Sequence, residues 1–180
     1  CWNAVNTLPK PASNAPIIGI FQDSMLGCYQ FTRPGVNFTQ QQAMNLLFMY
    51  PYINLNALKD KGETVTSFDI LSQILPPLSL KYETGLYKDD GSEDKETSNN
   101  ILEIKNGEYI RGQMEKKVLG ATTKGIIHRI YNDYGIKVAT DFIDNIQNVI
   151  TEYMKTASFS VGISDLISNK ATHDSIIQII

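Results

Sequence analysis

The chain has 180 residues, enough for one substantial hydrophobic core or two small ones. Hydrophobic residues make up 42% of it and charged residues 19%, so disorder throughout is excluded. The formal net charge of -3 argues against a nucleic-acid-coating protein or a polybasic membrane binder, and no apolar run approaches the ~20 residues of a membrane-spanning helix. Two cysteines, Cys1 and Cys28, cannot supply a disulfide framework or a four-thiolate zinc site.

Both ends of the sequence indicate a piece of a longer protein. The chain opens on Cys1 rather than Met, and its start lacks the basic and apolar regions of a signal peptide. Its last residues, 175–180, are almost entirely apolar, which is typical of an element whose packing partners lie elsewhere.

The first predicted elements are two short strands. The runs IIGIF (residues 17–21) and MLGCYQF (residues 25–31) are apolar, rich in β-branched or aromatic residues and separated by a polar break. A turn is expected at Pro34-Gly35, where the strand pair ends.

Two helices are predicted next. Thr39 and Gln42 have the spacing of a capping box, which places a helix over residues 40–50, with Met44, Leu47 and Phe48 facing inward. A shorter helix begins near Ser67 and ends at Pro76-Pro77, because proline cannot continue a helix. The apolar side chains of this second helix fall on one side: Phe68, Leu71 and Leu75.

A polar loop and a hairpin follow. Residues 88–100 contain no large apolar side chain, so they are expected to form an exposed loop. Asn106-Gly107 lies between two alternating runs and is a strong hairpin signal, because both turn positions need positive φ. Leu102 and Ile104 alternate with charged residues, but Ile101 breaks that alternation.

The clearest prediction is one long amphipathic helix over residues 136–155. Its apolar residues recur at three- and four-residue spacing and form a single stripe: Phe142, Ile146, Val149, Ile150, Tyr153 and Met154. Helices and strands are mixed without regular alternation, so the predicted fold class is α+β rather than a doubly wound sheet.

Lys116 and Lys117 are the most suggestive polar pair. They stand between the predicted hairpin and a Gly-Ala-Thr-Thr-Lys-Gly turn, where two ammonium groups beside backbone N–H donors could hold a phosphate. A solvated strand end, with Glu115 as a partial partner, is the simpler interpretation, since most charged side chains are merely exposed. The turn is not a phosphate-binding P-loop, because Lys124 precedes the closing glycine.

The other candidate residues are better explained by structural roles than by metal binding or catalysis. Asp23 could coordinate a metal, but an Asp at a polar break more often caps a turn. The acidic residues of the 88–100 loop lack calcium-loop spacing. His128 and His173 are far apart without a ligand pattern, and His128 lies in a β-like run that suggests a structural or surface role. No catalytic set and no metal site is predicted, so the residues alone do not identify an enzyme.

Three stretches together resemble the largest subunit of multisubunit DNA-directed RNA polymerases. The first, residues 14–33, is similar to the family's Gly-Ile-x-Gln-Asp-x-Leu-x-Gly segment and the Thr-Arg pair after it. The second, residues 109–130, is similar to its Gly-x-x-x-Lys-Lys-x-x-Gly segment and the Gly-Leu-Ile-His run that follows. The third, residues 142–167, resembles a long helix that ends in Phe-Ser-x-Gly-Ile-x-Asp. Their order and approximate spacing also agree with the family.

This resemblance implies a non-catalytic part of a transcribing nucleotidyltransferase. The family's Asp-rich motif, which binds Mg²⁺, does not occur here and would lie upstream. Residues 1–33 would then be the end of the active-site double-psi β-barrel, with closing strands. Residues 34–155 would form the pore domain, a mixed helix and hairpin unit, and residues 156–180 the start of the funnel.

The resemblance also implies residue roles and partners. Lys116 and Lys117 would line the channel for nucleoside triphosphates, and Gln22 and Asp23 would support the active-site floor without binding metal. The partners would be the second-largest subunit, other polymerase subunits, the RNA 3′ end and a cleavage factor in the pore, and DNA through the full complex, with no membrane. The location would be the nucleus, or the host cytoplasm or virion for a large DNA virus.

Part of the sequence departs from the family. Residues 52–100 resemble it only loosely, and the acidic loop resembles a local insertion. The Asn-, Ile- and Lys-rich composition suggests a divergent, viral member. The alternative is an autonomous α+β nucleotide- or protein-binding module without catalysis, which a start codon and a stop codon at the two ends of this sequence would support.

Overall fold

The computed structural model describes residues 9–10, 12–85, 87, 97–170, 172, 175 and 177. Its helices are α2 (Gln22–Phe31), α3 (Gln40–Leu46), α4 (Leu55–Lys59), α5 (Ser67–Ile74), α7 (Lys116–Leu119), α8 (Ile126–Met154) and α9 (Ile163–Leu166). Its strands are β1 (Asn37–Thr39), β2 (Thr64–Thr66), β3 (Leu80–Glu83), β4 (Ile101–Lys105) and β5 (Glu108–Arg111). Residues 88–96 of the expected acidic loop, and most of the apolar end, lie outside the described residues.

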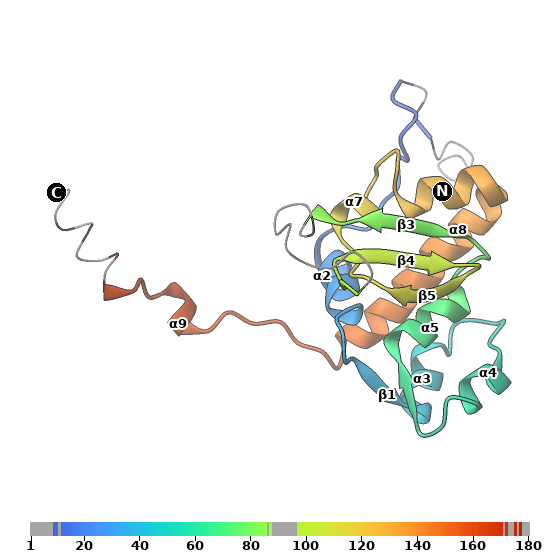
Figure 1. Cartoon of the computed structure of the whole chain (residues 1–180), viewed down its shortest axis with the longest axis horizontal. Helices are drawn as coiled ribbons and strands as arrows, with labels where there is room; N and C mark the ends of the chain where they lie inside the picture. Colours follow the sequence, from blue (N-terminus) through green and yellow to red (C-terminus); the bar gives the residue numbers. More distant parts are fainter. Residues whose placement is uncertain are drawn as a thin grey trace.

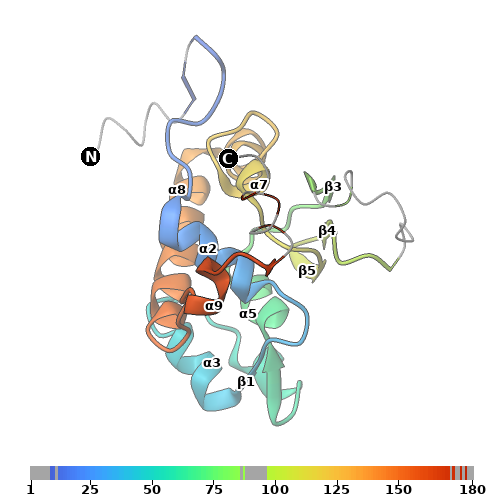
Figure 2. The ribbon, with the colours of Figure 1, turned by 90° about the vertical axis from the view of Figure 1, so that its left-hand side faces the viewer.

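Helix α8 organises the body (Figure 1). Helices α2, α3 and α5 pack against it, and α5 also packs against β5. Figure 2 shows α8 along one side of the body and the β3-β4-β5 sheet on the opposite side, with α2 and α5 between them. This mixture of helices and small antiparallel sheets confirms the predicted α+β class.

The sheets are antiparallel ribbons. β1 pairs with β2, and β3, β4 and β5 form a second sheet in that order. The β4–β5 hairpin is confirmed, with φ of 48° at Asn106 and 84° at Gly107. A register shift between Glu103 and Ile104 interrupts this pairing. Ile101, Leu102 and Ile104 are all buried, so both faces of β4 are covered where the alternation breaks.

The strands predicted over residues 17–31 were wrong. The backbone of residues 17–21 forms no strand, and residues 22–31 form helix α2. The reason is packing on α8: Cys28 and Phe31 are fully buried, and the Cα of Gly27 faces Ile150 so closely that an added Cβ would lie 2.6 Å from it. A helix brings these three positions to one face, which a strand cannot do.

The capping box of α3 is confirmed, but the predicted helix was too long. The Thr39 hydroxyl accepts a hydrogen bond from the Gln42 N–H, and the Gln42 side chain accepts one from the Thr39 N–H. The helix ends at Leu46, and the turn that follows buries Leu47. Met44 is 49% exposed and Phe48 is 80% exposed, so their predicted inward orientation was wrong.

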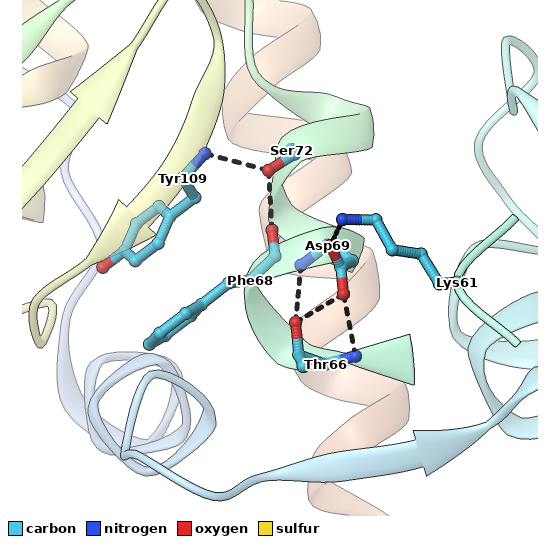
Figure 3. A network of polar contacts seen from close by, with 6 residues as sticks. All are labelled: Lys61, Thr66, Phe68, Asp69, Ser72 and Tyr109. Atoms are coloured by element: carbon cyan, nitrogen blue, oxygen red, sulfur yellow. Dashed lines mark hydrogen bonds and ion pairs between the residues drawn. The ribbon is translucent and has the colours of Figure 1, made fainter. Parts of the chain in front are cut away.

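A polar network connects β2 with α5 and β5 (Figure 3). The hydroxyl of Thr66 accepts the N–H of Asp69 at 3.2 Å, and the Asp69 carboxylate accepts the Thr66 N–H at 3.1 Å. The ammonium group of Lys61 lies 2.8 Å from the same carboxylate. Further along α5, the Ser72 hydroxyl accepts the N–H of Tyr109 at 2.9 Å. Helix α5 is therefore held at its start and along its side.

Helix α8 contains the predicted amphipathic helix and an earlier arm. Gly135 has a φ of 84° and interrupts the helical geometry between the two arms. In the second arm the predicted stripe faces the core, with Phe142, Ile146, Val149 and Ile150 buried. The first arm contains His128, whose expected β-like run was wrong, because this segment is helical and His128 is only 8% exposed.

The chain leaves the body after α8. Helix α9 has no buried residue, and every described residue from Ser158 onward is exposed. Figure 1 shows this tail extending away from the body. In the polar loop expected over residues 88–100, Ser98 is only 6% exposed, so the exposed loop does not extend through all of residues 97–100.

Candidate functional site

The paired lysines lie on α7, a single helical turn. Lys116 and Lys117 are exposed, whereas the next residues, Val118 and Leu119, are 1% and 0% exposed. The predicted strand end was therefore wrong in its secondary structure. The two apolar side chains anchor the turn in the core, so both ammonium groups remain on the surface.

Glu115 has a different role from that expected. Both oxygens of its carboxylate accept the backbone N–H of Gly85, each at 3.1 Å. A Cβ on Gly85 would lie 3.4 Å from the Nζ of Lys117 and 3.4 Å from Glu115, so Lys117 lies near this carboxylate. Burial, and then the charge of Glu115, raise the pKa of Tyr82. Among the described residues, the Lys116 side chain has no ion pair or hydrogen bond.

The first and second resembling stretches meet at α7. The N–H of Ile20 donates a 3.0 Å hydrogen bond to the carbonyl of Leu119. Beside this bond, a Cβ on Gly19 would lie only 2.6 Å from the backbone nitrogen of Ala121. Figure 1 shows the N-terminal segment running beside α7. Sequence reasoning missed this contact, because nothing local to either stretch indicates its partner.

Gln22 and Asp23 lie at the start of α2 and are both exposed. Gln22 has a φ of 52°, in the left-handed region that few non-glycine residues occupy. Within the part of the chain that the structure describes, neither side chain makes a hydrogen bond or ion pair. The Ile20–Leu119 bond places both residues just after the segment that contacts α7.

The family described as RNA polymerase Rpb1, domain 3, matches residues 8–166. This match includes α7, α8 and the N-terminal segment that contacts α7. The chain belongs to the Rpb1 domain 3 family.

Known relatives agree with this assignment. The chain is 29% identical over 178 residues to "DNA-directed RNA polymerase subunit 1" of Acanthamoeba polyphaga mimivirus, an alignment that covers 99% of this chain and 11% of that protein. It is 28% identical over 171 residues to "DNA-directed RNA polymerase II subunit RPB1-B" of Trypanosoma brucei brucei, which covers 91% of this chain and 9% of the relative. The Rpb1 domain 3 chain thus spans about a tenth of these relatives. The predicted membership in the largest-subunit family is confirmed.

Among the described residues, no group of three or more His, Cys, Asp and Glu side chains could hold a metal ion. Over the same part of the chain, no helix has the length and apolar character needed to cross a membrane. The described residues do present two exposed lysines on a turn that buried side chains anchor.

Proposed function

We propose that this chain lines the channel through which nucleoside triphosphates reach the catalytic centre of an RNA polymerase, and that Lys116 and Lys117 contact the triphosphate. The observation that carries the proposal is the exposed pair on α7, whose turn is anchored by two buried side chains. Positive charge along a narrow passage concentrates a polyanion and accelerates its arrival. Charge-assisted hydrogen bonds to phosphate oxygens would then orient the nucleotide.

The activity of the whole subunit, in this proposal, is DNA-directed synthesis of RNA. Mg²⁺ would be held by residues upstream of this chain, and the metal would activate the nucleotide for transfer. Gln22 and Asp23 would support the active-site floor from the start of α2. The contact of Ile20 with Leu119 supports this arrangement, because it connects their segment directly to the lysine turn.

The domain boundaries are part of the same proposal. Residues 1–33 would end the active-site barrel, with α2 as a helical part of it, residues 34–155 would form the pore domain, and residues 156–180 would begin the funnel. The partners would be the second-largest and other subunits, DNA, and a cleavage factor that reaches the RNA 3′ end through the pore. The complex would act in the nucleus, or in the host cytoplasm or virion of a large DNA virus.

The test is steady-state nucleotide dependence in the assembled polymerase. Lys116→Ala with Lys117→Ala should raise the apparent KM for nucleoside triphosphates about tenfold or more, since each charged contact is worth roughly 1.5–3 kcal/mol. The kcat at saturating nucleotide should stay within about twofold, because the chemistry uses other residues. The matched control removes two exposed lysines elsewhere, Lys59→Ala with Lys137→Ala, and should leave KM unchanged. An unchanged KM in the first variant contradicts the proposal.

A further inference from the structure

A hollow of about 400 Å³ lies between β3 and the start of α8. Cationic residues from three segments line it: Lys81 on β3, Lys124 in the loop before α8, and Arg129 on α8. Tyr82 and Asn132 add groups that can form hydrogen bonds, and His128 also lines the hollow. None of the described residues that line the hollow is acidic. It is a different feature from the lysine turn, because neither Lys116 nor Lys117 lines it.

The start of α8 adds backbone donors to the hollow. The N-cap residue, Gly125, also lines the hollow, and within the described part of the chain no side chain caps this end of the helix. A Cβ at Gly125 would lie 2.7 Å from the carbonyl oxygen of Val118, so a capping Ser, Thr or Asp cannot occupy this position. The N–H groups of the first turn therefore lack a side-chain acceptor, and the helix dipole favours an anion there.

The lining is held in place by His128. Its Nδ1 donates to the carbonyl oxygen of Thr123, next to Lys124 in the loop. Its Nε2 can then accept the Asn132 side-chain N–H at 3.4 Å, one helical turn further along. The 8% exposed imidazole thus links the loop to the helix beneath the hollow. Such a link keeps the cationic loop and the helix start in a fixed arrangement.

Two carboxylates of the described residues lie near these cations: Glu103 is opposite Lys81 in the β3–β4 register, and Asp133 pairs weakly with Arg129. Arg129 lies 3.4 Å from Asp133, and the two side chains are 55% and 50% exposed. Ion pairs this exposed contribute little and are screened by salt. A ligand with several negative charges can therefore compete with Asp133 for Arg129.

We propose that this hollow binds the di- or triphosphate group of a ligand. Three cationic side chains and an open helix start match several phosphate charges, whereas a single carboxylate would leave cations unpaired. The shared chemistry is a phosphate oxyanion, whose source is either a free nucleotide or the backbone of an RNA strand. The site uses none of the residues in the proposed function and stands or falls independently of it.

The experiment is calorimetric titration of the 180-residue chain with tripolyphosphate at low ionic strength. One binding event per chain is expected. The variant Lys81→Gln, Lys124→Gln, Arg129→Gln should weaken binding at least about tenfold. All three residues are exposed, so the variant should keep the circular dichroism spectrum and melting temperature of the parent chain. A six-nucleotide RNA without terminal phosphates distinguishes the two sources of phosphate. It should bind the parent chain and not the hollow variant if the ligand is an RNA backbone, and bind neither if the ligand is a free nucleotide.

The matched control removes three exposed lysines elsewhere: Lys10→Gln, Lys59→Gln and Lys137→Gln. It should bind tripolyphosphate within about twofold of the parent chain, because the lysines removed do not line the hollow. Three results overturn the proposal: no binding by the parent chain, equal binding by the hollow variant, or equal weakening in the control. The last result would show a general charge effect rather than a site.

Discussion

The backbone N–H of Ile20 donates a 3.0 Å hydrogen bond to the carbonyl oxygen of Leu119. Both side chains are buried, at 2% and 0% exposed, so this bond lies at the edge of the core. It fixes the N-terminal segment against the turn that presents Lys116 and Lys117. Two of the three stretches that resemble the polymerase family are therefore parts of one contact, although they are distant in the sequence.

The close approach at Gly19 should not tolerate a side chain. In Gly19→Ala the new Cβ would lie 2.6 Å from the Ala121 nitrogen and 2.8 Å from the carbonyl carbon of Gly120. Because both are backbone atoms, relief requires a shift of the chain, and we expect a loss of ~1–3 kcal/mol in the free energy of unfolding. Urea denaturation measures it. Gly85→Ala is the control, since its Cβ would meet its nearest atoms at 3.4 Å, an ordinary contact distance. A comparable loss of stability in that variant would contradict the assignment of the Gly19→Ala effect to backbone overlap.

Two phenylalanines provide a matched test of the core. Phe31 is 0% exposed and packs against the rings of Phe38 and Tyr153 at centroid distances of 5.5 and 5.0 Å. Phe31→Ala should cost ~3–5 kcal/mol, because it removes buried contacts and leaves a cavity. Phe48 is 80% exposed, so Phe48→Ala should stay within ~0.5 kcal/mol. Denaturant unfolding compares them, and equal losses would contradict the orientation of α2 or of the turn after α3.

Asp69 should make stability depend on pH. Burial raises the pKa of its carboxyl, but hydrogen bonds from Lys61 and Thr66 outweigh burial and hold that pKa below its usual value. Because its pKa is lower in the folded state, the ionised carboxylate stabilises the fold at pH values above the unfolded-state pKa of ~3.9. This stabilisation is lost as the pH falls through the folded-state pKa. Asp69→Asn should therefore be less stable than the parent at pH 7, and the difference should shrink below about pH 4.

Thermal unfolding at several pH values measures this difference. Asp144→Asn removes an exposed carboxylate from α8 and should match the parent within ~0.5 kcal/mol throughout. A gap between Asp69→Asn and the parent that stayed constant down to low pH would mean that the charge of Asp69 is not responsible.

The thiol of Cys28 should be unreactive in the folded protein. Burial raises its pKa to about 12, so at pH 8 only ~10⁻⁴ of it is thiolate, the reactive form. In a Cys1→Ser background, where Cys28 is the remaining cysteine, labelling with an alkylating reagent should be very slow in buffer and fast in denaturant. Rapid labelling in buffer would show that α2 separates readily from α8.

Local chemistry explains what the sequence could predict. The Thr39–Gln42 capping box and the Asn106-Gly107 turn depend on backbone needs that neighbouring residues satisfy, so both were confirmed. The apolar stripe around Phe142 and Ile146 was confirmed because it extends over several turns. Patterns of that length distinguish a helix from a strand without any knowledge of the partner.

The α2 segment shows where such reasoning fails. A short apolar run with aromatic residues has similar composition whether it forms a strand or a buried helix. Ser24, Gly27, Cys28 and Phe31 do have helical spacing, which was the available signal. What decides the outcome is the apolar face of α8, and nothing within residues 25–31 indicates that face.

The candidate sites were likewise predicted only in part from the sequence. The family resemblance pointed to Lys116 and Lys117, but not to their position on a one-turn helix or to the contact of Glu115 with Gly85. Lys124 and Arg129 are near each other in the sequence, whereas Lys81 comes from β3. The hollow they line depends on how the sheet packs beside α8, so only the structure, and not the sequence, could show it.

The tail after α8 has a practical consequence for purified material. Phe159, Val161, Ile163, Leu166 and Ile167 are each at least 58% exposed and contribute nothing to the core. These exposed apolar side chains should promote self-association as the protein concentration rises. A chain ended after Ala157 should sediment as a monomer over a wider concentration range while melting at the same temperature.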